Sequence, residues 1–194
     1  MSADKFKELI KQFDCPVVLE IGTRRVARTP STVHRDWVPH AAKYIGSDFA
    51  SGQDVDVVAD VCELSTVFGE QSFDAIISCS VLEHIQYPWV AAVEMSRTLK
   101  VGGFMFVMTH QTFPLHAHPH DYYRFSKEGL ETLFSPQIGL ECIESAHNYR
   151  APIMSNAPGR LRRAAAPSYL NSTILVKKVS HPPADFKWRA VSDA

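Results

Sequence analysis

Hydrophobic residues recur along the chain with two kinds of spacing, one typical of helices and one typical of buried strands. Residues 3–13 place Phe6, Leu9, Ile10 and Phe13 on one side of a helix, which predicts an amphipathic helix with one apolar face. Short apolar runs rich in β-branched residues follow it. They predict strands at residues 17–21, 43–47, 55–59, 73–79 and 104–109.

The pattern predicts further elements between and after these strands. A helix of about 18 residues is expected from residue 81 or 82 to Leu99, and Pro88 is expected either to start its main part or to kink it. Gly102 and Gly103 are expected to stop this helix. Beyond residue 110 we expect a loop, a short helix over residues 126–134 with Ser126 as its N-cap, and strands at residues 138–145 and 172–179. Apolar strands alternating with helices predict an α/β fold whose mostly parallel central sheet has helices on both faces.

Length and composition favour one soluble domain. The chain has 194 residues, of which 45% are hydrophobic, so we expect a single domain over residues 1–180 and a loose tail over residues 181–194. A net charge of −1 argues against a general nucleic-acid binder, and no apolar run approaches the length of a membrane span. The N-terminus lacks an apolar signal core, so a cytoplasmic location is expected.

Acidic residues stand at the ends of successive predicted strands. Glu20, Asp48 and Asp60 lie at or near the carboxyl ends of strands that we expect to be parallel. Open α/β sheets bind ligands at that edge, and a carboxylate there can accept both hydroxyl groups of a ribose. The alternative is that each acid caps the next helix or turn. Three acids in succession favour a nucleoside-type ligand.

The loop after the first strand limits what that ligand is. Residues 22–27 contain one glycine, Gly22, whereas a dinucleotide loop uses three to wrap its backbone around a pyrophosphate. An NAD-linked oxidoreductase is therefore disfavoured.

Five segments carry a pattern that is similar to a known family. In order, they are residues 17–22, 44–48, 57–60, 73–85 and 99–103. Together they resemble the class I S-adenosylmethionine-dependent methyltransferases, specifically the type 11 group. The resemblance implies a Rossmann-like class I methyltransferase fold with an antiparallel C-terminal strand, and S-adenosyl-L-methionine as cofactor.

The resemblance also implies which residues contact the cofactor. Asp48 matches the acid that holds the ribose hydroxyls, and Phe49 lies against the adenine. The full set of implied cofactor contacts is Glu20, Gly22, Thr23, Asp48, Phe49, Asp60, Val61, Ser78, Cys79 and Ser80. The usual second glycine of the first motif is missing from residues 23–25, so this loop must approach the cofactor differently.

Histidine is abundant, and four of the nine histidines lie between His110 and His120. Methyl transfer to a hydroxyl group needs a base, and histidine suits that role near neutral pH. The candidates for catalysis are His84, His118, His120 and Asp121, and the candidates for substrate binding are Tyr122, Tyr123 and Arg124. The alternatives are that His84 caps its helix and bonds a neighbouring loop, that the loop histidines are exposed polar residues, and that Tyr123 and Phe125 anchor the loop.

The same histidines also suggest a metal. His116, His118 and His120 alternate, and Asp121 adds a carboxylate, a set that suits zinc. Pro119 and the lack of a partner cluster weigh against this reading, and the four cysteines have no zinc spacing. We assign no metal from the sequence.

The sequence thus favours a methyltransferase that acts on a small molecule or glycan-type acceptor by direct in-line displacement. The alternative is a catalytically inactive relative that serves as a binding or scaffold protein. Residues 1–149 carry a net charge of −7 and residues 150–194 one of +6, with Arg160, Arg162 and Arg163 close together. This basic end would suit an anionic acceptor. The oligomeric state is not predicted.

Overall fold

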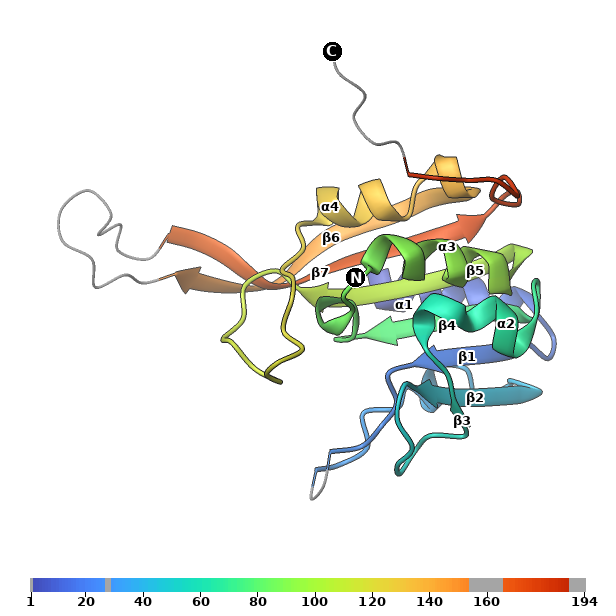
Figure 1. The fold of residues 1–194 in the computed structure, drawn as a ribbon, viewed down its shortest axis with the longest axis horizontal. Helices are drawn as coiled ribbons and strands as arrows, with labels where there is room; N and C mark the ends of the chain where they lie inside the picture. The colour runs from blue at the N-terminus through green and yellow to red at the C-terminus, as the bar shows by residue number, and fades with distance from the viewer. Residues whose placement is uncertain (1, 27–28, 154–165, 189–194) are drawn as a thin grey trace, which may run out of the picture.

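A seven-stranded sheet forms the centre of the protein in a computed structural model, which describes residues 2–26, 29–153 and 166–188 (Figure 1). The strand order is β3-β2-β1-β4-β5-β7-β6. The strands are β1 (Val17–Ile21), β2 (Lys43–Asp48), β3 (Val57–Val58), β4 (Phe73–Cys79), β5 (Leu99–His110), β6 (Leu140–Ile153) and β7 (Ala166–Lys178).

The first five strands run parallel to one another, and the last two are antiparallel additions. β7 pairs antiparallel with β5, and β6 pairs antiparallel with β7. The chain order reverses between β1 and β4, which places the carboxyl ends of β1, β2 and β4 side by side. The predicted fold class, mostly parallel with antiparallel C-terminal strands, is therefore confirmed.

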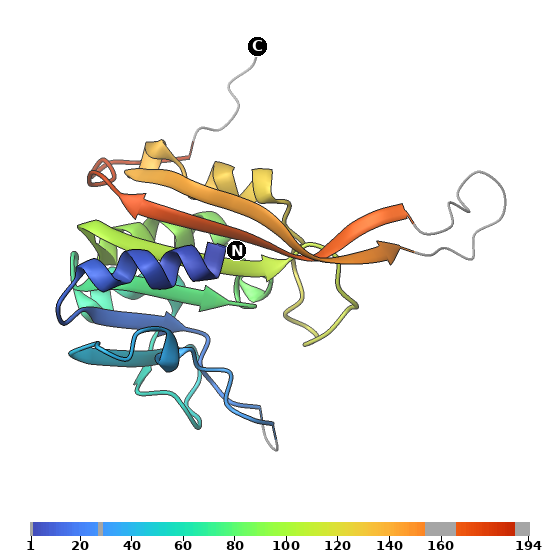
Figure 2. The same ribbon diagram turned by 180° about the vertical axis from the view of Figure 1, so that it is seen from behind.

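Helices cover both faces of the sheet. On one face lie α1 (Ser2–Leu9) and η1 (Ile10–Gln12) (Figure 2). They bury Phe6 and Ile10 completely, and Phe6 packs against Phe106 of β5. The other face carries α2 (Leu64–Phe68), α3 (Pro88–Thr98) and α4 (Lys127–Leu133), which pack on a second apolar cluster (Figure 1). The amphipathic helix predicted at the N-terminus is confirmed, with its last turn as 3-10 helix.

The long helix predicted before β5 is wrong in extent. Residues 82–84 form only a 3-10 turn, η4 (Leu82–His84), and α3 begins at Pro88. Proline disfavours helical conformation in the residue before it, so Tyr87 is not helical (φ −122°, ψ 66°) and α3 begins at the proline. The helix ends at Thr98, one residue before the predicted Leu99, because Leu99 already pairs with Phe73 in the sheet.

The strand predictions differ most at the two sheet edges. β3 at one edge has only two residues, whereas β6 and β7 at the other are much longer than predicted. Their pairing runs from Leu140 opposite Lys178 to Ile153 opposite Ala166. The far half of this pair extends beyond the other strands as a twisted arm (Figures 1 and 2). Ser126 caps α4 as expected, by accepting a hydrogen bond from Gly129 N.

Residues near the C-terminus pack on the α3 side. Phe186 and Trp188 lie against the apolar cluster, and Trp188 Nε1 donates to the carbonyl of Trp89 at 3.0 Å. Shorter 3-10 turns complete the fold: η2 (Arg35–Trp37), η3 (Val61–Glu63) and η5 (Pro136–Ile138). The basic residues Arg160, Arg162 and Arg163 lie outside the described residues. A search of the described helices finds none that is both long enough and apolar enough for a membrane span.

Candidate active site

The carboxyl ends of β1, β2 and β4 bring three of the sequence motifs together. Ile21 at the end of β1 pairs with Ser47 on one side and with Ser78 on the other. The chain after β1 stays close to β2, since Gly22 N donates to the carbonyl of Ser47 at 2.7 Å. The segments that follow these three strands therefore meet at one edge, as the positions of the acids predicted.

Gly22 lies at the closest approach of two of these segments. Its φ of +82° is in the left-handed region that favours glycine. A Cβ atom at this position would lie 2.1 Å from Cγ2 of Val81, in the loop after β4. Glycine therefore lets the two loops touch at the centre of the edge.

Asp48 and Phe49 stand at the end of β2, and Arg24 lies over both. The Asp48 carboxylate accepts hydrogen bonds from the backbone N–H groups of Arg24 and Ala50, and Arg24 Nε lies 3.6 Å from Oδ1. The Arg24 guanidinium carbon is 5.6 Å from the centre of the Phe49 ring, which is 68% exposed. An acid beside an exposed aromatic ring suits a nucleoside, whose ribose and base need these two groups. Arg24 has to swing aside to admit one.

Glu20 is engaged away from this edge. Its buried carboxylate accepts from the backbone N–H of His34 at 3.0 Å and from Tyr44 Oη at 2.5 Å, and it lies 2.6 Å from His34 Nδ1. Burial and the Glu20 carboxylate raise the pKa of Tyr44, which therefore stays a hydrogen-bond donor. In this structure Glu20 fastens the segment around His34 to the α1 side of the sheet.

The other implied cofactor contacts surround the edge. Thr23 is buried, and its backbone N–H donates to the same carbonyl of Ser47 that holds Gly22. Asp60 caps η3 by accepting from Cys62 N at 2.8 Å, as the capping alternative expected, and Val61 begins that turn. Ser78, Cys79 and Ser80 end β4, and Ser80 has a φ of +57°. Burial raises the pKa of Cys79, so its thiol stays protonated.

A loop rich in histidine is fastened beside this edge. We call residues 111–124 the histidine loop. Its ends are joined by a hydrogen bond from Phe125 N to the carbonyl of His110 at 2.9 Å. The backbone N–H groups of Tyr122 and Tyr123 both donate to the carbonyl of Glu83 in η4. The loop is thus held against the segment that follows β4.

Asp121 and Arg124 brace this loop from within. Arg124 donates to both oxygens of Asp121, at 2.5 and 2.9 Å, and also to the carbonyls of Phe113 and Pro114. The Arg124 guanidinium holds the pKa of Asp121 well below its usual range. Both side chains therefore have a structural partner, which favours a scaffold role over the catalytic and substrate-binding roles expected for them.

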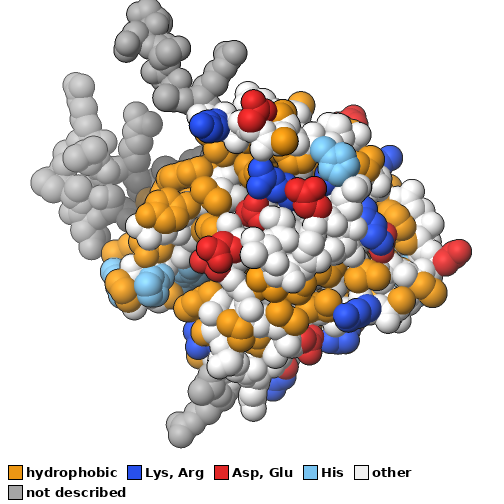
Figure 3. Space-filling model, turned by 45° about the vertical axis from the view of Figure 1, so that its right-hand side comes forward, with side chains coloured by type: hydrophobic (Ala, Val, Ile, Leu, Met, Phe, Trp, Pro, Cys, Tyr) orange, Lys and Arg blue, Asp and Glu red, His pale blue; other side chains and the backbone are white. Residues whose placement is uncertain are grey.

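The remaining loop candidates differ in exposure. His118 and His120 are exposed, and His120 Nδ1 lies 3.1 Å from Tyr122 Oη. Tyr123 is half-buried against the apolar cluster and donates to the carbonyl of Gln86 at 3.1 Å, so it anchors the loop. In the space-filling view, histidines gather beside hydrophobic side chains on one flank of the molecule (Figure 3). His120 and Tyr122 thus form an exposed polar pair on the loop.

The sequence reasoning did not single out Glu83 and His110. Glu83 is completely buried after β4, and His110, which ends β5, places its Nε2 3.1 Å from Glu83 Oε1. The signal was available, since His110 ends β5 and Glu83 lies four residues after the end of the neighbouring parallel strand β4.

A hollow of about 450 Å³ lies elsewhere, beside β2. Two of the acids that line it already have partners: Asp54 accepts from Arg25 at 2.8 and 2.9 Å, and Asp56 accepts from Gly46 N at 2.8 Å. We therefore place the candidate site at the strand ends and not in this hollow.

An open sheet in this strand order, with acids after successive parallel strands, defines the class I methyltransferase fold. Residues 26–107 match the family model described as a methyltransferase domain. The first-strand motif at residues 17–22, whose following loop departs from the family pattern, lies outside that match. The resemblance to the type 11 S-adenosylmethionine-dependent methyltransferases is thereby confirmed.

Solved structures show the same fold at low sequence identity. A methyltransferase from Archaeoglobus fulgidus is 16% identical, with a TM-score of 0.60 over 91% of this chain and 92% of that one. The 1,6-didemethyltoxoflavin-N1-methyltransferase of Burkholderia thailandensis, which holds 1,6-didemethyltoxoflavin and S-adenosylhomocysteine, is 14% identical, with a TM-score of 0.61 over 92% and 79%. A search of the curated proteins finds no match.

Proposed function

We propose that the protein moves a methyl group from S-adenosyl-L-methionine to a small-molecule or glycan-type acceptor by direct in-line displacement. The observation that carries this proposal is the pairing of Asp48 with the exposed ring of Phe49 at the edge where Gly22 meets the β4 loop. The match to the methyltransferase domain and the cofactor product in the Burkholderia structure support it.

The residues at this edge fit the cofactor. Asp48 holds the ribose hydroxyls and Phe49 contacts the adenine, with Asp60 and Val61 beside it. The β1–β2 and β4 loops hold the amino-acid end, through Gly22, Thr23, Ser78, Cys79 and Ser80. Glu20 contributes to cofactor binding indirectly, because it fixes the chain around His34.

Methyl transfer requires the protein mainly to align the acceptor with the methyl group of the cofactor. When bound, the cofactor supplies an electrophilic methyl group on a sulfonium that departs as a neutral thioether, so no acid is needed at the sulfur. The strand-end loops hold the cofactor, the histidine loop holds the acceptor, and positioning provides much of the rate enhancement. For a hydroxyl acceptor, His120 removes the proton, with Tyr122 as its hydrogen-bond partner.

The histidine loop sets the character of the acceptor. Phe113, Leu115 and Tyr122 expose 40%, 77% and 41% of their surface, respectively, and provide apolar contacts for a small ring system or a sugar face. Arg124 is engaged by Asp121, so an anionic acceptor would have to find its cation outside the loop.

The first test is calorimetry of the purified chain with S-adenosylmethionine and S-adenosylhomocysteine. We expect saturable binding of both ligands, and Asp48→Asn should weaken each by about 10- to 100-fold, because it removes charged hydrogen bonds to the ribose. Asp54→Asn is the matched control, since Asp54 pairs with Arg25 away from the edge, and should leave affinity unchanged. No binding by the wild type at millimolar ligand would favour the inactive scaffold protein instead.

Replacing Arg24 should have the opposite effect. In Arg24→Ala the Asp48 carboxylate is released from its ion pair, so the cofactor no longer has to displace the arginine. The pair is partly exposed and contributes little, so we expect affinity to rise by about 2- to 5-fold. The same titration with Arg25→Ala should show no gain, and a loss of affinity in Arg24→Ala would mean that Arg24 contacts the cofactor directly.

A further inference from the structure

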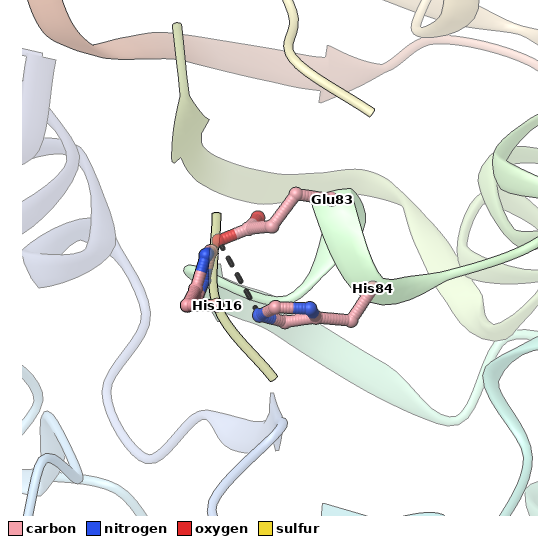
Figure 4. A group of neighbouring side chains, drawn as sticks. All are labelled: Glu83, His84 and His116. Carbon is pink, nitrogen blue, oxygen red and sulfur yellow. Dashed lines mark ion pairs between the residues drawn. The ribbon is translucent and has the colours of Figure 1, made fainter. Parts of the chain in front are cut away.

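Glu83, His84 and His116 converge beside the candidate active site. We call these three residues the Glu83 cluster. Glu83 and His84 are neighbours in η4, and His116 reaches them from the histidine loop (Figure 4). One potential ligand atom from each side chain lies within 4.8 Å of the other two, and Glu83 Oε1 is 3.8 Å from His84 Nε2.

The Glu83 carboxylate is only half satisfied. Its Oε2 accepts a hydrogen bond from Thr109 Oγ1 at 2.7 Å. Its Oε1 is buried and has no hydrogen-bond partner among the described residues. Such an oxygen costs about 1–3 kcal/mol when nothing compensates it. The free oxygen points to the two histidine rings (Figure 4).

In their neutral form the two histidine rings offer lone pairs to this oxygen and no hydrogens. His84 Nδ1 lies 2.6 Å from the carbonyl of His120, and His116 Nδ1 lies 3.1 Å from the carbonyl of Pro114. A carbonyl oxygen only accepts, so Nδ1 carries the hydrogen in both neutral rings and Nε2 carries the lone pair. His84 Nε2 thus faces the free oxygen of Glu83 with no hydrogen between them.

A third histidine, His110, also places a ring nitrogen beside the free oxygen of Glu83. Its Nδ1 lies 3.0 Å from Asn171 Oδ1, and its Nε2 is 3.1 Å from Glu83 Oε1 without forming a hydrogen bond. A carboxylate oxygen surrounded by imidazole lone pairs is repulsive unless a cation lies among them. Ring nitrogens held by backbone carbonyls are also the arrangement that orients histidine toward a metal ion.

We propose that Glu83, His84 and His116 bind one divalent transition-metal ion. Two imidazoles and one carboxylate suit zinc and its first-row neighbours. For bonds of about 2.1 Å, ligand atoms around a tetrahedral zinc lie about 3.4 Å apart, so the cluster needs to contract only slightly. Of the alternating histidines that the sequence suggested as metal ligands, only His116 belongs to this site. Its partner ligands, which the sequence pattern did not reveal, are Glu83 and His84.

Three protein ligands leave a coordination position open, as in catalytic zinc sites. The site joins η4 to the histidine loop, beside the edge where the strand motifs meet. If the proposed function holds, an acceptor oxygen bound there would lose its proton more readily, because a metal ion lowers the pKa of an oxygen that it coordinates. This last step rests on the proposed function, whereas metal binding does not.

The test is calorimetric titration of the chelator-treated full chain with zinc chloride, and separately with manganese chloride, without S-adenosylmethionine. We expect saturable zinc binding with a stoichiometry of one. His116→Gln and Glu83→Gln should each weaken it by at least about 100-fold, because each removes a ligand and loss of an outer partner alone costs about 10- to 100-fold. His118→Gln, in the same loop but outside the cluster, should bind zinc like the wild type.

Circular dichroism shows whether each variant folds. If Glu83→Gln does not fold, His116→Gln still tests the site, because His116 lies on an exposed loop. Zinc binding that is absent in the wild type, or equally strong in His116→Gln, would overturn the proposal. Zinc binding without cofactor binding would support the metal site and contradict the proposed methyl transfer. Cofactor binding without zinc binding would contradict the metal site and leave the proposed methyl transfer supported.

Discussion

Gly22→Ala is expected to lower the free energy of unfolding by about 3 kcal/mol. The left-handed φ of Gly22 costs an alanine about 1–2 kcal/mol. The new Cβ would also lie 2.1 Å from Val81 Cγ2, and overpacking of this kind adds about 1–3 kcal/mol. Urea denaturation followed by circular dichroism measures the sum.

Two further variants separate these causes. Gly102 has a similar φ of +89°, but a Cβ there meets nothing within 4 Å, so Gly102→Ala should lose only the cost of the backbone conformation. Adding Val81→Ala to Gly22→Ala should recover the part that comes from the clash. Equal losses in Gly22→Ala and Gly102→Ala would mean that the two loops are not in tight contact.

Lys178→Met should destabilise the protein by about 2 kcal/mol at pH 7. The Lys178 side chain is completely buried, and its Nζ donates to the carbonyls of Ser96 and Leu99 at 2.6 Å each. These carbonyls lie at the carboxyl end of α3, where the helix leaves acceptors unpaired and favours a positive charge. Methionine fills the space but donates nothing, so the acceptors stay buried without a partner.

The loss should grow as the pH rises. Burial lowers the pKa of Lys178 from 10.5 to about 8 in the folded chain. Between these values the unfolded chain binds the proton more tightly, so unfolding becomes less favourable as pH increases, by up to about 3 kcal/mol for this group. Lys178→Met has no group that titrates at this position, so its free energy of unfolding should not show this increase with pH. Lys177→Met, at an exposed neighbouring position, should keep it, and identical pH profiles for the wild type and Lys178→Met would contradict the assignment.

The sequence predicted the parts of the fold in which local pattern and tertiary contacts agree. β1 and β4 were placed to the residue, since an apolar strand that is buried on both faces has a distinctive composition. The helix before β5 was predicted too long because its apolar spacing continues through Ile85, whereas Pro88 and pairing of Leu99 with Phe73 decide the ends. The arm of β6 and β7 has no apolar period to reveal its length.

The site was predictable in outline and not in its pairings. Acids after parallel strands placed Asp48 at the edge, because that rule depends only on strand direction. The partner of Asp48 depends on how the loop after β1 folds back, and Arg24 is four residues from Glu20 in a segment without a periodic pattern. The cluster around Glu83 needs contacts between η4 and the histidine loop, 33 positions apart for Glu83 and His116, which spacing alone does not show.

The long pairing of β6 with β7 has a consequence for how the molecule opens. Near Leu140 the two strands lie on a buried core, whereas β6 is half-exposed or exposed from Glu141 to its end at Ile153. The hydrogen bonds of the arm are thus supported by few apolar contacts, and such regions open locally at low free energy. One continuous strand pair therefore spans a gradient of rigidity, and its outer end can fray and re-form while the sheet and its ligand edge stay closed.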